Sequence, residues 1–508
     1  MNNMRSNIKI QNFVTYIVLI LIGIVVFFII GEEVPMVAKD TGVYTEISQT
    51  DGVMPIYPLF AYVCRKIFGE HYVYMAMVII QGILAIVCTL YFTRFLQIEC
   101  KLNSIMTVAV YILSLIPFLT YLPEANISHI ILTEGLALPL SYLMIVYISK
   151  GYITNRLSWL FAALGVAAIL YLIRSQLLIA ILLVSGFIFI KLICSRHNPC
   201  AVIVEVFISG LMAIGTFTVC FVLFLGYLNI VVPVLEDKNK VVEETWFNKN
   251  IPQSTSSEVR DDETTEGDNS RIITSSSQFS RLVMNRGIYF LEDEDYTLYE
   301  SVEKQQAFKV VIDSIRKNNA KGLYIDNPIN WSKKWDEQGL VNERNVNYAI
   351  DGLSDYYRSL YPQYSDVEIW GLVKTDVIQF SVDALRLHPL KVLNLFVRLF
   401  FAGLQASIFF QPDGLFVASE IITCFLLVFS GVLLWVSRKN NENYVILFRI
   451  TCASVLVYAF MISAIHYPLQ RYLIYFQGMY YVTMSIMLLK GVENKRNGDC
   501  CNNSDFVF

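Results

Sequence analysis

The sequence predicts an all-α polytopic membrane protein with about 10 to 11 transmembrane helices and a mixed, mainly helical polar module. Apolar runs of about 20 residues, the length that a helix needs to cross the hydrocarbon core, recur from end to end. Of the 508 residues, 55% are hydrophobic and only 16% are charged, whereas soluble proteins carry about 25% charged residues. The formal net charge of −4 averages apolar helices with an acidic segment, so it indicates no nucleic-acid partner.

The apolar segments expected to span the bilayer lie at 13–31, 72–93, 104–121, 130–149, 157–173, 175–193, 201–229, 415–437, 444–465 and 472–490. The first is too long for the apolar region of a signal peptide, and no small-residue cleavage site follows it, so we expect a retained helix. A further apolar stretch, 389–410, contains Lys391 and Arg398. These charges favour a segment that lies in the interface or re-enters the membrane. If this stretch spans the membrane completely, one of the later loops violates the rule that positively charged loops lie on the cytoplasmic side.

Positively charged residues predict the orientation, because short cytoplasmic loops are enriched in Lys and Arg. Basic residues fall at alternate ends of the spans, as at 94–101 and 150–156. This distribution predicts a multi-pass protein of the cell membrane with a cytoplasmic N-terminus and a cytoplasmic tail. The opposite, extracytoplasmic ends then comprise the loop 32–71, the segment 121–130, the break at Arg174 and the loop 466–471.

A change of composition divides the chain into four parts: 1–229, 230–390, 391–490 and 491–508. The first and third are transmembrane, and the fourth is the tail. The second opens with "SEVRDDETTEGDNS" and continues with helical patterns such as "SVEKQQAFKVVIDSIRKN". It is long enough for a small core of its own, and we expect a soluble extracytoplasmic module. None of the 10 cysteines lies in it, so a disulfide framework is not expected.

The first extracytoplasmic loop contains "VAKDTGVYTEISQTDGVMPIYPLF", which is more elaborate than a simple connector needs to be. Pro55 and Pro58 restrict the backbone and begin an apolar-faced helix that we expect to lie in the membrane interface. This arrangement would hold Asp40 near the membrane surface, where a carboxylate can accept a proton from an acceptor hydroxyl. The alternative is a hydrated acidic loop without chemistry. Further candidates for contacts in this loop and with the acceptor are Tyr44, Glu46 and Tyr57.

Acidic residues also mark the start of the fourth span, in "YLPEANISHIILTEGLALPL". Glu134 enters the bilayer region, where a carboxylate is costly unless a partner or a cavity receives it. Glu124 and His129 precede it, and carboxylate and imidazole groups can bind a divalent cation such as Mg²⁺ or Mn²⁺. Their spacing is not specific to a metal, and a helix N-terminus by itself favours negative charge. A metal-binding role and a structural role therefore both stay open.

Two arginines lie at the extracytoplasmic ends of spans. Arg174 interrupts the apolar run 157–193, which is too long for one helix and suits two short ones. Arg471 begins the last span in "IHYPLQRYLIYF". A guanidinium group stays charged and binds phosphate through two parallel hydrogen bonds, so the two arginines together favour a phosphate site. Each one alone is explained equally well by a side chain that reaches to the interface.

In order and sidedness these motifs resemble the GT-C superfamily of integral-membrane glycosyltransferases, especially the branch of protein O-mannosyltransferases and lipid A aminoarabinose transferase. The resemblance covers 13–230 and the last span. It rests on the first helix, "KDTGVYTEISQTDGVMPIYPLF", "LTEGLALPLSYLM", "FAALGVAAILYLIRSQLLIAILL" and "RYLIYFQ". Two departures stand out: Ser175 replaces a commoner proline, and Asp40 lacks the acidic neighbour that many members have.

The resemblance implies transfer of one sugar, with inversion, from a polyprenyl-phosphate donor to an extracytoplasmic glycan, lipid or protein. Asp40 would be the catalytic base, and Glu134 would organise the donor phosphate or a metal. The phosphate would be bound by Arg174, Arg471 and Tyr472. Alternatives are a polysaccharide polymerase or ligase that moves a whole glycan, and a lipid-linked glycan transporter without catalysis. A sensor or structural protein whose polar module binds a partner is a third.

Overall fold

The structure is a computed structural model that describes residues 2–29, 35, 41–45, 47, 53–119, 130–194, 199–239, 278–318, 331–408, 416–465 and 473–498. These residues are mostly helical, and no β-strand occurs among them. Within the same residues, 6 helices are long and apolar enough to cross a membrane, and shorter apolar helices accompany them. The prediction of an all-α polytopic membrane protein is confirmed to this extent.

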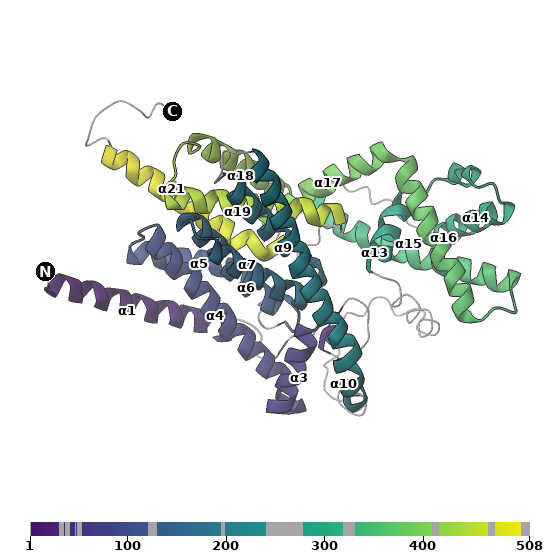
Figure 1. Cartoon of the computed structure of the whole chain (residues 1–508), viewed down its shortest axis with the longest axis horizontal. Coiled ribbons are helices and arrows are strands. Elements are labelled where there is room, and N and C mark those ends of the chain that lie inside the picture. The colour runs from purple at the N-terminus through teal and green to yellow at the C-terminus, as the bar shows by residue number, and fades with distance from the viewer. Residues whose placement is uncertain are drawn as a thin grey trace.

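Helices occupy the positions of the predicted spans. They are α1 (Asn2–Ile24), α4 (Val73–Glu99), α5 (Ser104–Leu119), α6 (Glu134–Ile153), α7 (Leu157–Ile173), α8 (Leu178–Cys194), α9 (Pro199–Gly226), α18 (Phe416–Val436), α19 (Asn443–Ile465) and α21 (Gln477–Gly498). Most of them pack together in one bundle (Figure 1). Apolar side chains are exposed on the outer helices, as expected of surfaces that face lipid.

Helix α6 lies at the centre of the bundle and packs against α4, α7 and α19. Residues on every side of α6 are buried, and they include the aromatic residue Tyr142. The Tyr142 ring packs edge-on against Phe92, with 5.1 Å between the ring centroids. Because neighbouring helices surround α6, polar groups at its start are enclosed by protein.

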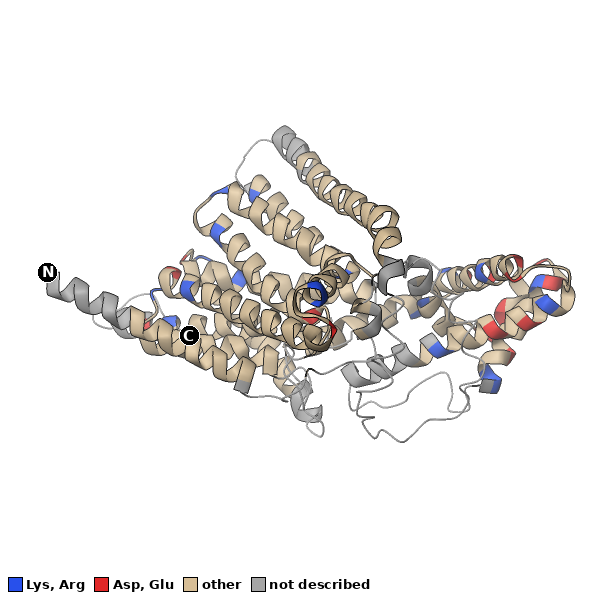
Figure 2. Ribbon diagram, turned by 90° about the horizontal axis from the view of Figure 1, so that it is seen from below, with Lys and Arg blue, Asp and Glu red and all other residues tan. Residues whose placement is uncertain are grey.

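A second hydrophobic core lies in the polar module. Its helical elements are α13 (Gln278–Gly287), η5 (Ile288–Phe290), η6 (Asp293–Leu298), α14 (Val302–Asn318), α15 (Trp331–Leu360) and α16 (Asp366–Leu387). Phe308 and Phe380 meet edge-on at its centre, with 5.3 Å between their centroids. Figure 2 shows charged residues gathered on this module and sparse over the bundle.

Helix α17 (Pro389–Ile408) connects the two cores, which the sequence did not indicate. Leu395 and Leu399 belong to the core of the module, whereas Leu404 and Ile408 belong to that of the bundle. The helix is continuous over 20 residues, and its length and composition suit a membrane span. Lys391 and Arg398, in the first half of 389–410, favour an interfacial or re-entrant segment when only the sequence is considered. That half packs on the module.

The first loop and the end of α9 form a third, small cluster. Helix α3 (Ile56–Phe68) has the amphipathic character predicted for it, with Tyr57 and Ala61 buried and Ile67 exposed. Helix α9 continues through η4 (Tyr227–Val231) into α10 (Val232–Asn239), beyond the expected boundary at 229. Ile47 of the loop, Tyr227 and Val232 form the buried part of this cluster, and Leu59 and Tyr62 of α3 pack against it.

Candidate functional site

A charged pair is buried at the start of α6. The Arg174 guanidinium donates from Nη1 to Oε1 of Glu134, and the two side chains are 2% and 0% exposed. Glu134 is the first residue of α6, where the helix dipole favours a carboxylate. Arg174 has an extended backbone between α7 and the short helix η3 (Ser175–Leu177), so the predicted break in the apolar run is real.

Neighbouring polar side chains add hydrogen bonds to this pair. The Thr133 hydroxyl donates to Glu134 Oε2 at 3.0 Å and accepts from Arg174 Nη1 at 3.1 Å. Arg174 Nε donates to Gln176 Oε1 at 2.6 Å. A buried ion pair persists in an apolar surrounding only when such bonds satisfy its remaining groups. The result is a charge-neutral cluster inside a bundle of apolar helices.

The first loop contacts this cluster through the short helix α2 (Thr41–Thr45). The buried Thr41 hydroxyl donates to the carbonyl oxygen of Ile131 at 2.9 Å, three residues before Glu134. The Tyr44 ring centroid lies 5.9 Å from the Arg174 guanidinium carbon, within the range of a cation–π interaction. A loop that is remote in sequence is thereby fixed to the segment before α6 by Thr41 and to the charged pair by Tyr44.

Gln81 of α4 joins the same region, and sequence reasoning missed it. Tyr57 donates its hydroxyl hydrogen to Gln81 Oε1 at 2.9 Å, and Gln81 Nε2 donates to the Ile130 carbonyl oxygen at 3.2 Å. Burial raises the pKa of Tyr57 well above its usual value, and the Glu134 carboxylate raises it further. The phenol therefore stays protonated and remains a donor. A single glutamine within "VYMAMVIIQGILAIV" was the available signal, because polar residues in membrane helices form interhelical hydrogen bonds.

Of the residues expected in the site, Tyr44, Tyr57, Glu134 and Arg174 are brought together. Glu134 and Arg174 are partners of each other, a pairing that no local sequence pattern indicates. The other candidates lie outside the described residues: Asp40, Glu46, Glu124, His129, Arg471 and Tyr472. Among the residues that the structure does describe, no group of three or more His, Cys, Asp or Glu side chains could hold a metal ion.

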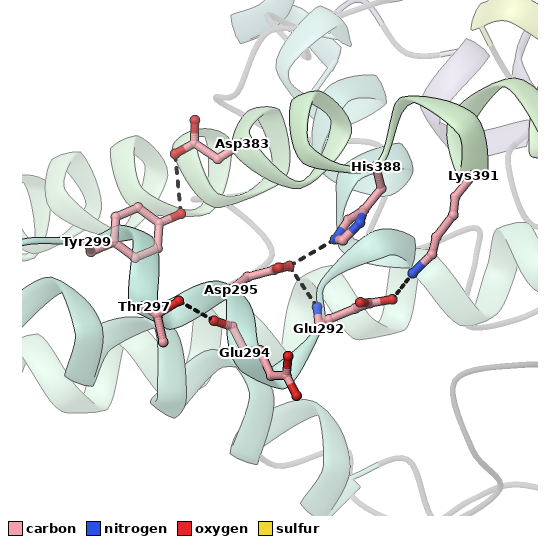
Figure 3. Close-up of polar contacts among 8 residues, drawn as sticks. All are labelled: Glu292, Glu294, Asp295, Thr297, Tyr299, Asp383, His388 and Lys391. Atoms are coloured by element: carbon pink, nitrogen blue, oxygen red, sulfur yellow. Dashed lines mark hydrogen bonds and ion pairs between the residues drawn. The ribbon is translucent and has the colours of Figure 1, made fainter.

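A second polar cluster joins η6 to the α16–α17 corner of the module (Figure 3). His388 Nε2 lies 3.3 Å from Asp295 Oδ2, which also accepts from the Glu292 backbone N–H at 2.9 Å. Lys391 forms an ion pair with Glu292, and Tyr299 donates to Asp383 Oδ2 at 3.3 Å. Each of these groups has a protein partner within the module, so the cluster holds η6 against the α16–α17 corner.

The buried cluster at α6 is therefore the better candidate for chemistry. It combines a fixed guanidinium, a carboxylate and phenol groups at one end of the membrane helices. The chain matches no protein-family model, and no curated protein or solved structure shows significant similarity to it.

Proposed function

We propose that the chain is a membrane glycosyltransferase that moves one sugar from a polyprenyl-phosphate donor to an extracytoplasmic acceptor, with inversion. The observation that carries the proposal is the attachment of the first loop to the charged pair's surroundings: Thr41 bonds to the Ile131 carbonyl just before α6, and the Tyr44 ring contacts the buried Arg174. Asp40 directly precedes Thr41 in the sequence. A carboxylate that precedes, in the sequence, a helix in contact with a buried guanidinium suits a reaction that needs both a base and a phosphate-binding group.

The charge balance of the cluster supports a donor with a single phosphate. Glu134 already compensates the positive charge of Arg174, so a bound phosphodiester with one negative charge needs one further positive charge. Arg471 supplies it in this proposal, and Tyr472 adds a hydrogen bond. Around the donor phosphate, two arginines, one glutamate and one phosphodiester then sum to zero, which suits a site of low dielectric; the Asp40 carboxylate acts on the acceptor and adds its own charge on that side. A divalent Mg²⁺ or Mn²⁺ bound by Glu124 and His129 is the alternative source of that charge.

The proposed reaction is a direct displacement at the anomeric carbon. Asp40 accepts the proton of the acceptor hydroxyl while the hydroxyl oxygen forms the new glycosidic bond. The bond from the anomeric carbon to the phosphate oxygen breaks on the opposite face of the sugar, and the polyprenyl phosphate leaves with the electron pair. The transition state resembles an oxocarbenium ion. Arginines fixed before the reaction stabilise the charge that develops on the phosphate.

The test is sugar transfer from a panel of polyprenyl-phosphate sugars in membranes that contain wild type or Asp40→Asn. We expect transfer by the wild type and a loss of at least about 100-fold in the variant, because general bases contribute on that scale. Asp51→Asn, the same substitution in the same loop, is the matched control and should retain transfer. Equal activity of Asp40→Asn would remove this base from the mechanism. Transfer of a whole glycan would indicate a polymerase or ligase, and donor translocation without transfer a transporter.

A further inference from the structure

An aromatic surface lies at the turn between α15 and α16, away from both polar clusters. The rings of Tyr361 and Tyr364 are stacked, with a centroid distance of 4.9 Å and an interplanar angle of 13°. Tyr357 extends the stack, and its centroid lies 6.3 Å from that of Tyr361. Tyr364 is 41% exposed. A ring held in place by stacking thus keeps much of its area open to solvent.

Hydrogen bonds fix this turn before any ligand is bound. The Tyr364 N–H donates to the Tyr361 carbonyl oxygen at 3.0 Å, and the Tyr361 hydroxyl donates to Glu303 at 2.6 Å. Ser365 caps α16 through reciprocal bonds with Glu368. A surface that is ordered in advance loses little conformational entropy when a ligand binds. The exposed tyrosine is therefore positioned as a binding group would be.

The chemistry around the tyrosines favours a carbohydrate as the ligand. Aromatic rings pack against the apolar C–H face of a sugar, and charged side chains at the edge exchange hydrogen bonds with its hydroxyls. Arg358 and Asp366 form such an edge, 3.2 Å apart and exposed. With Glu303 and Glu368 they provide three carboxylates and one guanidinium. This negative balance disfavours an anionic membrane surface or a nucleic acid.

The position of the surface indicates the length of the ligand. Helix α16 has 22 residues, so about 33 Å separate its start from α17. Figure 1 shows the α15–α16 turn on the side of the module away from the bundle. An acceptor that contacts this turn while its reacting end reaches the bundle must extend over at least this distance, which for a glycan requires several sugars.

We propose that the surface formed by Tyr361 and Tyr364 binds a glycan of several sugar units that serves as the acceptor. This inference rests on the proposed transferase function and extends it, because it commits to a polysaccharide as the acceptor, in place of a protein or a single lipid headgroup. The module binds the glycan several sugars away from its reacting end, and that end receives the new sugar.

The test measures oligosaccharide binding to the full chain in detergent micelles, without a donor, by isothermal titration calorimetry. The probes are cellohexaose, chitohexaose and maltohexaose with their disaccharides. We expect at least one hexasaccharide to bind, and Tyr364→Ala to weaken it about tenfold through loss of ring stacking. Tyr364→Phe keeps the ring and should bind as the wild type does. Leu298→Ala removes a similarly exposed side chain of the module, 49% exposed, and should leave binding unchanged.

Three results would overturn the inference: no hexasaccharide binds, Tyr364→Ala binds as tightly as wild type, or a disaccharide binds as tightly as its hexasaccharide. Thermal unfolding of each variant shows whether a loss of binding reflects a loss of the fold. The outcome is separable from that of the proposed reaction. No donor is present, so a failure here leaves transfer by the wild type and its dependence on Asp40 unchanged.

Discussion

Ion pairs occur both in the helix bundle and in the polar module, and the two regions differ in how exposed the paired side chains are. In the bundle, the side chains of Arg174 and Glu134 are 2% and 0% exposed. In the module, those of Lys391 and Glu292 are 55% and 47% exposed. A charge in the module that loses its partner is solvated by water, whereas one in the bundle is left in an apolar surrounding. The same kind of contact therefore constrains the sequence strongly in one region and weakly in the other.

The largest effect is expected from breaking the buried pair on one side only. Glu134→Leu leaves the Arg174 guanidinium without its carboxylate, which should lower the free energy of unfolding by about 3–5 kcal/mol. The double variant Glu134→Leu with Arg174→Met removes both charges and should recover much of that loss. Unfolding of the purified chain in detergent micelles, followed by circular dichroism, measures the three proteins under one condition.

This comparison also separates stability from the proposed chemistry. The double variant should be folded and yet inactive in sugar transfer, because the phosphate-binding guanidinium is absent. A double variant that transfers sugar at the wild-type rate would make the pair a structural feature alone. If Glu134→Leu alone is as stable as the wild type, the Arg174 charge is not buried in an apolar surrounding, and the comparison fails.

A smaller effect is expected at the neutral network beside the pair. Gln81→Leu leaves the buried Tyr57 hydroxyl without its acceptor, which should cost about 1–3 kcal/mol. Adding Tyr57→Phe removes the hydroxyl that Gln81→Leu leaves unpaired. The double variant should therefore lose less stability than the sum of the losses in the two single variants. A double-mutant cycle in the same unfolding assay measures this coupling. Strict additivity would show that the hydrogen bond contributes nothing to stability.

The positions of the helices could be predicted from the sequence, because bilayer thickness dictates the length of apolar runs. The break at Arg174 and the amphipathic α3 were visible for the same kind of reason, since each is a local pattern. The pairing of Arg174 with Glu134 was not, because 40 residues separate them and no periodicity connects them. The sequence marks the Glu134 carboxylate as costly in the membrane, and the partner that resolves this cost depends on how α6 packs against α7.

Helix α17 shows the same limit at the scale of a whole element. Its hydropathy and its charges, Lys391 and Arg398, pointed to conflicting positions in the membrane. The conflict disappears once the first half is seen to pack in the core of the module and the second half in the bundle. A single helix that serves two cores has no distinctive pattern, because both cores accept apolar residues at the same spacing.

The smallest effect is expected at the exposed pair of the module, and its sign depends on pH. The hydrogen bond from Lys391 lowers the pKa of Glu292. The pair therefore adds stability above the unfolded-state pKa of about 4.3, and this stability is lost as the pH falls through the lower folded-state pKa. Lys391→Met should cost less than about 1 kcal/mol at neutral pH and approach zero in acid. Thermal unfolding at both pH values measures it, with Lys317→Met, an exposed lysine elsewhere in the module, as control. If Lys391→Met lowers stability as much in acid as at neutral pH, the loss comes from packing of the lysine stem and not from the ion pair. The difference between the exposed and the buried pair could then not be attributed to solvation of the charges.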